Sequence, residues 1–245
     1  MHHAPPTVVN WSALDPAGRA EAIARASAAP DRTVFVVHAG DDEARRVIAN
    51  AGVLRHLVAR PADPTDEPLA QDRVTLDPAS VDVRRWVSGL PIDLLVPPGS
   101  EAPSAALAEL GASLAPRLVR AADAALDELL TNARRAGPPV PIEVRLACDG
   151  GRLGVEVTDP HGALTLAGLA GFFAHLGSGD PWEIKMGSGG AGLGLAMVFT
   201  SMNHLLIAVR PGSSTRVLAL LDVAGGVRRA TRAGRSFNLF LEEVP

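Results

Sequence analysis

Hydrophobic and polar positions over residues 1–100 follow one another in short blocks, some with helical and some with strand-like spacing. The elements expected from this pattern are a helix over 10–29, a strand over 33–37, a helix over 41–60, a strand over 73–76, a helix over 81–88 and a strand over 92–96. The alternation of strands and helices predicts a small α/β module over 1–100, with a Pro- and Asp-rich break over 61–72.

A partner-binding or dimerising module and a degenerate response-regulator-like receiver are both consistent with this pattern, since no aspartate ends the strand over 92–96. We place a domain boundary near residue 100, at Pro97-Pro98-Gly99.

The periodicity changes after residue 104 to that of a long amphipathic helix, which ends at Gly137-Pro138. Its apolar positions lie three or four residues apart, at Leu114, Leu118, Ala122, Ala125, Leu129 and Ala133. Two alternating runs follow, over 142–147 and 153–158, and the turn Asp149-Gly150-Gly151 between them predicts a hairpin. The remaining expected elements are an apolar helix to about residue 202, a strand over 205–209 and an edge strand over 236–243.

Bulk composition limits the classes of function. The 245 residues are 47% apolar, which is enough to build buried cores. Acidic and basic residues are interspersed with a formal net charge of −4, so nucleic acid is not expected as a partner. Cys148 is the only cysteine, and no apolar run approaches the roughly 18 residues that a membrane helix needs. We predict a cytoplasmic protein without a membrane span; its single lysine, Lys185, is typical of GC-rich bacterial genomes.

Three polar residues with helical spacing could carry chemistry. Glu128, Asn132 and Arg135 recur at i, i+4 and i+7 beside the apolar stripe. A glutamate there can orient and partly deprotonate a water or hydroxyl, and the amide oxygen of an asparagine can complete a magnesium shell together with phosphate oxygens. An ordinary solvated helix edge would show the same spacing.

A carboxylate closes the second run of the predicted hairpin. Asp159 stands at the strand end, before Pro160-His161-Gly162. In that position it could accept a hydrogen bond from the exocyclic amine of adenine. The same four residues are also common turn chemistry.

The segment Gly187-Ser188-Gly189-Gly190-Ala191-Gly192-Leu193-Gly194 runs into an apolar helix. Glycines at a helix N-terminus let backbone N–H groups converge on an anion, so this segment predicts a phosphate cradle. It also fits the G-x-G-x-x-G fingerprint of dinucleotide-binding folds, with Arg210 as a contact for the 2′-phosphate of NADP. The polar residues over 178–185 are unlike the buried strand that a dinucleotide fold requires at this place.

Four motifs in a fixed order resemble the GHKL family of gyrase, Hsp90, histidine kinase and MutL ATPases. They are Glu128-Leu129-Leu130-Thr131-Asn132-Ala133, Asp159-Pro160-His161-Gly162, Gly190-Ala191-Gly192-Leu193-Gly194-Leu195 and Ser214-Thr215. The resemblance implies that residues 101–245 form a two-layer α/β sandwich, the Bergerat ATP-binding fold, which uses ATP and Mg²⁺.

The resemblance also implies roles for individual residues. Glu128 would be the general base, Asn132 the magnesium ligand and Asp159 the adenine-reading carboxylate, supported by Thr215. The other expected nucleotide contacts are Arg135, Gly162, Lys185, Gly187, Gly189, Gly190, Gly192, Leu193 and Gly194. The loop over 177–190 would be the ATP lid.

The chain has no helix-borne histidine before Glu128 like that of histidine kinases, and is more similar to the stand-alone anti-sigma-factor serine/threonine kinases. That similarity implies a signalling protein that phosphorylates or sequesters a protein partner; homodimerisation is left open. The family's first glycine box reads Asp-x-Gly-x-Gly, whereas this chain has His161 and Ala163 at the glycine positions. A non-catalytic ATP-dependent switch therefore stays an alternative, with an NADP-dependent oxidoreductase as a more remote one.

Overall fold

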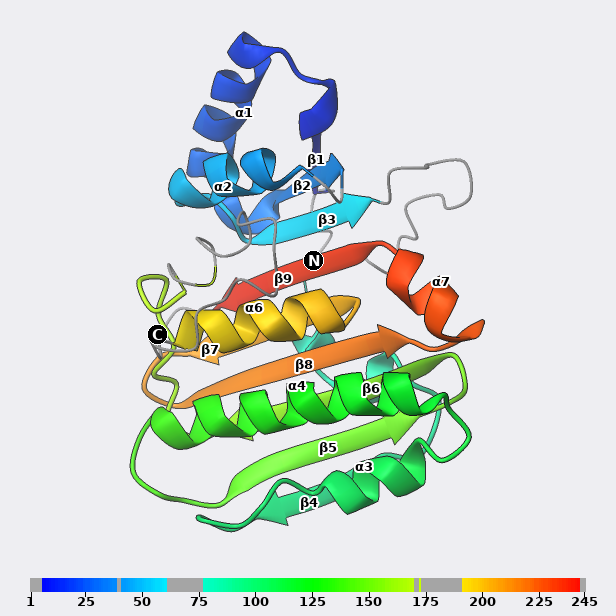
Figure 1. Cartoon of the computed structure of the whole chain (residues 1–245). Helices are drawn as coiled ribbons and strands as arrows, with labels where there is room; N and C mark the ends of the chain where they lie inside the picture. The colour runs from blue at the N-terminus through cyan, green and yellow to red at the C-terminus, as the bar shows by residue number, and fades with distance from the viewer. Residues whose placement is uncertain (1–5, 39–40, 61–76, 170–171, 173–190, 243–245) are drawn as a thin grey trace.

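The computed structural model describes residues 6–38, 41–60, 77–169, 172 and 191–242, and over these ranges the strands form one nine-stranded mixed sheet (Figure 1). The strand order is β1-β2-β3-β9-β7-β8-β6-β5-β4. The strands are β1 Thr7–Asn10, β2 Thr33–His38, β3 His56–Arg60, β4 Ile92–Val96, β5 Ile142–Cys148, β6 Arg152–Asp159, β7 His204–Arg210, β8 Ser214–Asp222 and β9 Arg235–Leu241. The α-helices are α1 Pro16–Ala28, α2 Asp42–Asn50, α3 Ser104–Leu110, α4 Pro116–Arg135, α6 Ala191–Ser201 and α7 Gly226–Arg232.

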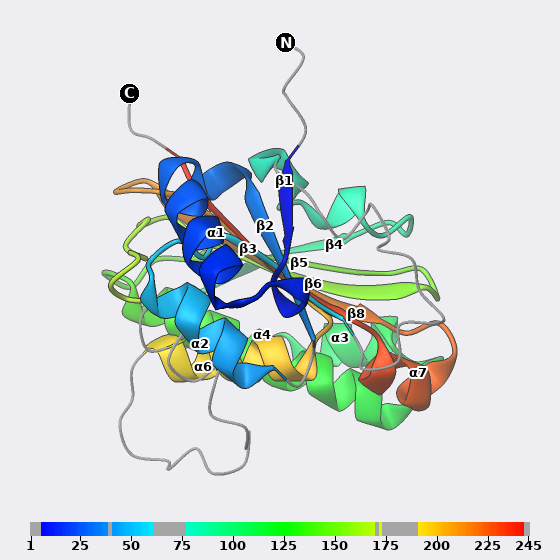
Figure 2. The same cartoon turned by 90° about the horizontal axis from the view of Figure 1, so that it is seen from above.

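Helices α4 and α6 lie side by side on one face of the sheet, as the two views in Figures 1 and 2 show. The apolar stripe of α4 is buried and joins the inward-facing side chains of the strands in the main core. This arrangement confirms the predicted fold class, an α/β sandwich of sheet and helices. Within the described ranges, no helix combines the length and the apolar character needed to cross a membrane.

The N-terminal strands β1, β2 and β3 are parallel and are connected by α1 and α2. The predicted helix over 10–29 begins only at Pro16, since residues 7–10 form β1. The predicted helix over 41–60 is wrong in its second half, because α2 ends at Asn50 and residues 56–60 form β3. That strand finds hydrogen-bonding partners on both sides, β2 and β9, and these outweigh the local helical spacing.

Two strands take places that the sequence pattern did not indicate. The strand over 92–96 forms as β4, but it pairs with β5 at the far end of the sheet. The C-terminal strand β9 was expected at an edge, whereas it lies between β3 and β7 and pairs with both. The sheet therefore continues from the N-terminal strands into the strands of the C-terminal half, and the boundary near residue 100 stays a prediction.

Two predicted helices differ in form. The single helix expected from residue 104 is divided into α3 and α4, and α4 starts at Pro116, a residue suited to the first helical turn but not to a helix interior. The segment over 81–88 contains a 3-10 turn, Val83–Arg85, after another at Pro78–Ser80. The strand predicted over 73–76 lies outside the described residues.

These 3-10 turns cover the second face of the sheet, where Val81, Val83 and Val87 pack with Leu206 and Leu218. A buried carboxylate stabilises the second of these turns against this face. Glu156 of β6 accepts hydrogen bonds from the backbone N–H of Val83 at 2.8 Å and from Arg145 at 2.8 Å. Burial raises the pKa of Glu156, and the Val83 N–H and the Arg145 charge oppose that rise.

We expect the Phe237→Ala variant to lower the free energy of unfolding by about 3–5 kcal/mol, because it opens a cavity in the middle of the sheet. Phe237 of β9 is fully buried and its ring lies 5.1 Å from that of Phe172 and 6.5 Å from that of Phe199. Urea denaturation measures the change. The matched control Leu90→Ala, at a side chain 92% exposed, should change stability by less than about 0.5 kcal/mol. Equal losses of unfolding free energy in Phe237→Ala and Leu90→Ala would contradict the central position of β9.

Candidate functional site

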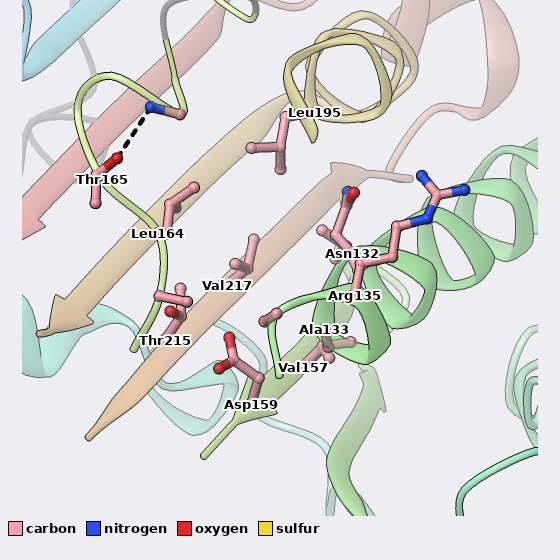
Figure 3. Close-up of a pocket in the computed structure, with 14 residues that line it drawn as sticks. Asn132, Ala133, Arg135, Val157, Asp159, Leu164, Thr165, Leu195, Thr215 and Val217 are labelled. Atoms are coloured by element: carbon pink, nitrogen blue, oxygen red, sulfur yellow. Dashed lines mark hydrogen bonds between the residues drawn. The ribbon is translucent and has the colours of Figure 1, made fainter. Parts of the chain in front are cut away.

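Helix α4 brings the three predicted polar residues to one edge of the buried stripe. Leu129 and Ala133 of the stripe are buried against the sheet. Because Asn132 and Arg135 lie on an adjoining side of the helix, they reach the edge of a cavity between α4, the sheet and α6 (Figure 3). Asn132 is half-buried and Arg135 is exposed at the rim.

The sheet contributes two polar side chains at neighbouring positions of adjacent strands. Asp159 ends β6, and Thr215 lies at the start of β8, directly opposite it in the antiparallel register. Only 6% of Asp159 and 3% of Thr215 is exposed. The pairing of β6 with β8 thus places a buried carboxylate beside a buried hydroxyl.

A cavity of about 250 Å³ lies between these elements. Figure 3 shows Asn132 and Arg135 on the α4 side, Asp159 and Thr215 at the strand ends, and Leu195 of α6 on the opposite wall. The lining residues are Leu129, Asn132, Ala133, Arg135, Ala136, Val157, Asp159, Ala163, Leu164, Thr165, Gly168, Leu195, Thr215 and Val217. Most of this lining is apolar, so a flat, largely apolar ring with a polar edge would match it.

Polar atoms at the cavity have unused hydrogen-bonding capacity. Asp159 Oδ1 accepts the backbone N–H groups of His161 at 2.9 Å and Gly162 at 3.2 Å, and Oδ2 has no such partner among the described residues. Thr215 Oγ1 and both polar side-chain atoms of Asn132 are buried without a hydrogen-bond partner in the same part of the chain. Since buried polar groups are nearly always paired in folded proteins, these atoms indicate a place for a polar ligand.

Glu128 lies at a different point, where α4 meets α6. A side chain at Gly194 would overlap the Glu128 carboxylate. Gly194 is therefore required for close packing of α6 on α4, whatever it contributes to nucleotide binding. Glu128 itself is half-buried.

The loop after Asp159 accommodates a histidine, His161, at a position where the first glycine box of the GHKL pattern has glycine. The His161 ring packs over Gly137, where an added Cβ would approach it to 2.6 Å. Gly162 has φ +59°, and a Cβ there would collide with the carbonyl oxygen of Arg210 in the turn between β7 and β8. Gly162 is thus needed to pack this loop under the turn, and its contact with a nucleotide stays a prediction.

Four of the other predicted contacts, Lys185, Gly187, Gly189 and Gly190, are outside the described residues. Gly192 and Leu193 lie in the first turn of α6. Arg210, the contact required by the dinucleotide alternative, donates from Nε to Glu242 at 2.5 Å.

Sequence reasoning missed the apolar walls. Val157 and Val217 form the floor from adjacent strands, and Leu164 and Leu195 line the sides. The two-residue periodicity of side chains along β6 could have identified Val157. This residue lies two positions before Asp159 and therefore shares its face of the sheet. Leu164 belongs to an irregular loop and had no such signal.

The described residues contain no group of three or more His, Cys, Asp or Glu side chains that could hold a metal ion by themselves. Asn132 can still contribute one ligand, because its buried side-chain oxygen has no hydrogen-bond partner within the described part of the chain. A magnesium ion there would take most of its oxygen ligands from phosphate groups and water.

A mixed sheet with α4 and α6 on one face and a polar-edged cavity below them defines an α/β-sandwich domain with a cavity for a ligand. Comparison with protein-family models assigns residues 118–239 to the histidine kinase-, DNA gyrase B-, and HSP90-like ATPases. The chain thus carries a domain of this family, which confirms the predicted GHKL superfamily. No curated protein was found to match the chain.

The contact between Glu128 and Gly194 can be tested by a double-mutant cycle. Gly194→Ala adds a methyl group where the Glu128 carboxylate lies, so we expect it to lower the free energy of unfolding by about 1–3 kcal/mol. Combining it with Glu128→Ala should recover most of that loss. Met197→Ala, an exposed position on the same helix, is the matched control. If the double variant recovers nothing, the two residues are not in contact.

Proposed function

We propose that this protein binds Mg²⁺-ATP in the cavity between α4 and α6, and that it phosphorylates a serine or threonine of a protein partner. The observation that carries the proposal is the set of buried, unpaired polar atoms of Asn132 and Thr215 beside Asp159 in an otherwise apolar cavity. The family of residues 118–239 supports a nucleotide as the ligand. This activity fits a cytoplasmic signalling role like that of the anti-sigma-factor kinases.

Adenine matches the chemistry of the cavity floor. Its exocyclic amine can donate to Asp159 Oδ2, because backbone N–H groups occupy only Oδ1. The Thr215 hydroxyl lies opposite Asp159 in the strand register and can bond a ring nitrogen, directly or through a water. Val157 and Val217 would then contact the faces and edges of the ring.

The phosphates would extend from the adenine pocket toward Asn132 and the start of α6. The backbone N–H groups in the first turn of that helix have no partners within the helix, and its N-terminal end attracts negative charge. Arg135 at the rim can contact a phosphate. A bound Mg²⁺ would neutralise phosphate charge, and Asn132 would hold it in place.

Glu128 would act on the partner's hydroxyl group. Its half-buried carboxylate can accept the hydroxyl proton while the partner oxygen forms a bond to the γ-phosphorus and the bond from phosphorus to the β,γ-bridging oxygen breaks. ADP is the leaving group. The products are the phosphorylated partner, ADP and a protonated Glu128, which returns its proton to solvent.

A non-catalytic switch is the second candidate function, and one observation favours it. Ala163 lines the cavity at a position where the GHKL glycine box has glycine, and its methyl group reduces the space for the nucleotide. In that case ATP binding would alter the affinity for a partner that is sequestered without being phosphorylated.

The Asp159→Asn variant tests adenine recognition. The asparagine oxygen can still accept the His161 and Gly162 N–H groups, but its amide nitrogen would face the adenine amine as a second donor. We expect ATP to bind about 10- to 100-fold more weakly, as measured by calorimetry. Asp127→Asn, at an exposed position on α4, should leave the affinity unchanged. Unaltered ATP binding by Asp159→Asn would exclude the adenine pocket.

The Glu128→Gln variant separates binding from turnover. It keeps the shape of the side chain against Gly194 and removes the base, so the ATP affinity should stay within about threefold while ADP formation falls by about 10²–10⁴-fold. Glu109→Gln, on the exposed side of α3, is the control. Equal turnover by Glu128→Gln and wild type would contradict the role of Glu128. The proposed reaction needs the partner hydroxyl, so ADP is measured with the protein partner present; a wild type that then binds ATP without forming ADP would support the switch.

A further inference from the structure

Five exposed arginines gather at one corner of the molecule, although the sequence as a whole is acidic. Arg228, Arg229 and Arg232 belong to α7, and Arg117 and Arg120 belong to the first turns of α4. Helix α7 packs against α4, and both views show it beside the end where α4 begins (Figures 1 and 2). We call these five residues the arginine corner.

The positive charges of the arginine corner are not neutralised from within the described part of the chain. None of the five takes part in an ion pair there, and the first turns of α4 and α7 contain no acidic residue. The nearest carboxylate along the chain before α7, Asp222, already bonds Arg152 and His204. Asp123, one turn beyond Arg120, is half-buried and is not paired with it.

Two further arginines, Arg235 and Arg45, lie close enough to influence each other. Arg235 follows α7 and donates to the backbone oxygen of Thr200 at 3.0 Å, which fixes it at the C-terminal end of α6. The pKa of Arg45 on α2 is lowered, first by burial and then by the positive charge of Arg235. Arg235, three residues after the end of α7, thus adds a positive charge next to this helix, on a chain whose formal net charge is −4.

The corner is remote from the nucleotide cavity. Strand β8 begins at the cavity with Thr215 and ends at Asp222, four residues before α7. The nine residues of β8 span roughly 26 Å. Nucleotide phosphates in the cavity would therefore not reach the arginine corner.

We propose that the arginine corner binds an acidic segment of a protein partner, at the end of the sheet opposite the nucleotide cavity. The proposal deepens the proposed function and rests on it for the existence of a partner. Guanidinium groups present two parallel N–H donors to a carboxylate, and several of them on adjoining helices can bind successive Asp or Glu side chains. The acidic remainder of the chain would repel a long nucleic acid, and the five corner residues offer no aromatic ring for base stacking.

The test uses the full chain and a fluorescently labelled peptide rich in Asp and Glu, with binding followed by anisotropy at low and at physiological salt. We expect salt-dependent binding that weakens by at least about tenfold in Arg228→Glu/Arg232→Glu. Arg117→Glu/Arg120→Glu should weaken it similarly without loss of stability, because carboxylates near a helix N-terminus are favourable. Arg25→Glu, at an exposed position on α1, should bind like wild type.

Four results would overturn the proposal. They are no binding of the acidic peptide, equal binding by wild type and Arg228→Glu/Arg232→Glu, tighter binding of a duplex DNA than of the peptide, and equal binding of a peptide in which Asn and Gln replace Asp and Glu. Titration of the same samples with Mg²⁺-ATP tests the proposed function separately. The corner variants should retain the wild-type affinity for ATP, so failure of either idea can be recognised by itself.

Discussion

The packing of α4 against β6 and β8 determines the geometry of the whole candidate site. This contact buries Leu129 and Ala133 on the strand floor, and so it fixes which side of the helix faces the cavity. Asn132 then comes to lie near Asp159, although 27 residues separate them in the sequence. Because interiors are densely packed, α4 cannot rotate to offer another side without opening the core. The polar chemistry of the site thus depends on an apolar contact.

A second close contact sets the position of α6. Its Gly194 leaves room for the Glu128 carboxylate, and its Leu195 forms a wall of the cavity. One glycine therefore brings the candidate base and the candidate phosphate-binding helix together. Gly194 thus serves helix packing in addition to any contact with phosphate. In the loop after Asp159, the absence of a side chain at Gly137 leaves room for the ring of His161.

The sequence indicated the polar residues of the cavity better than it indicated the order of the strands. Asn132, Asp159 and Thr215, which line one cavity in the structure, stood out because they belong to short motifs and because strand ends and helix faces follow simple periodicities. Strand pairing was not predictable in the same way: β4 joins β5, and β9 joins β3 and β7, through contacts between segments far apart in the chain. The arginine corner was missed for the same reason, since its members come from two helices that only the fold brings together. An even distribution of charged residues along a sequence does not imply an even distribution of charge on the folded surface.

The most direct test of the central claim is calorimetric titration of the wild-type chain with Mg²⁺-ATP, Mg²⁺-GTP and NADPH. If Asp159 reads the amine of adenine, ATP binds with one site per chain. GTP, which carries a carbonyl oxygen at that position, then binds at least about tenfold more weakly, since it would face a carboxylate with an acceptor. NADPH carries the same adenine but no triphosphate, so it should bind more weakly than ATP. Equal affinities for ATP and GTP would contradict recognition of adenine by Asp159 in this cavity, and tighter binding of NADPH than of ATP would contradict the assignment of the cavity to ATP.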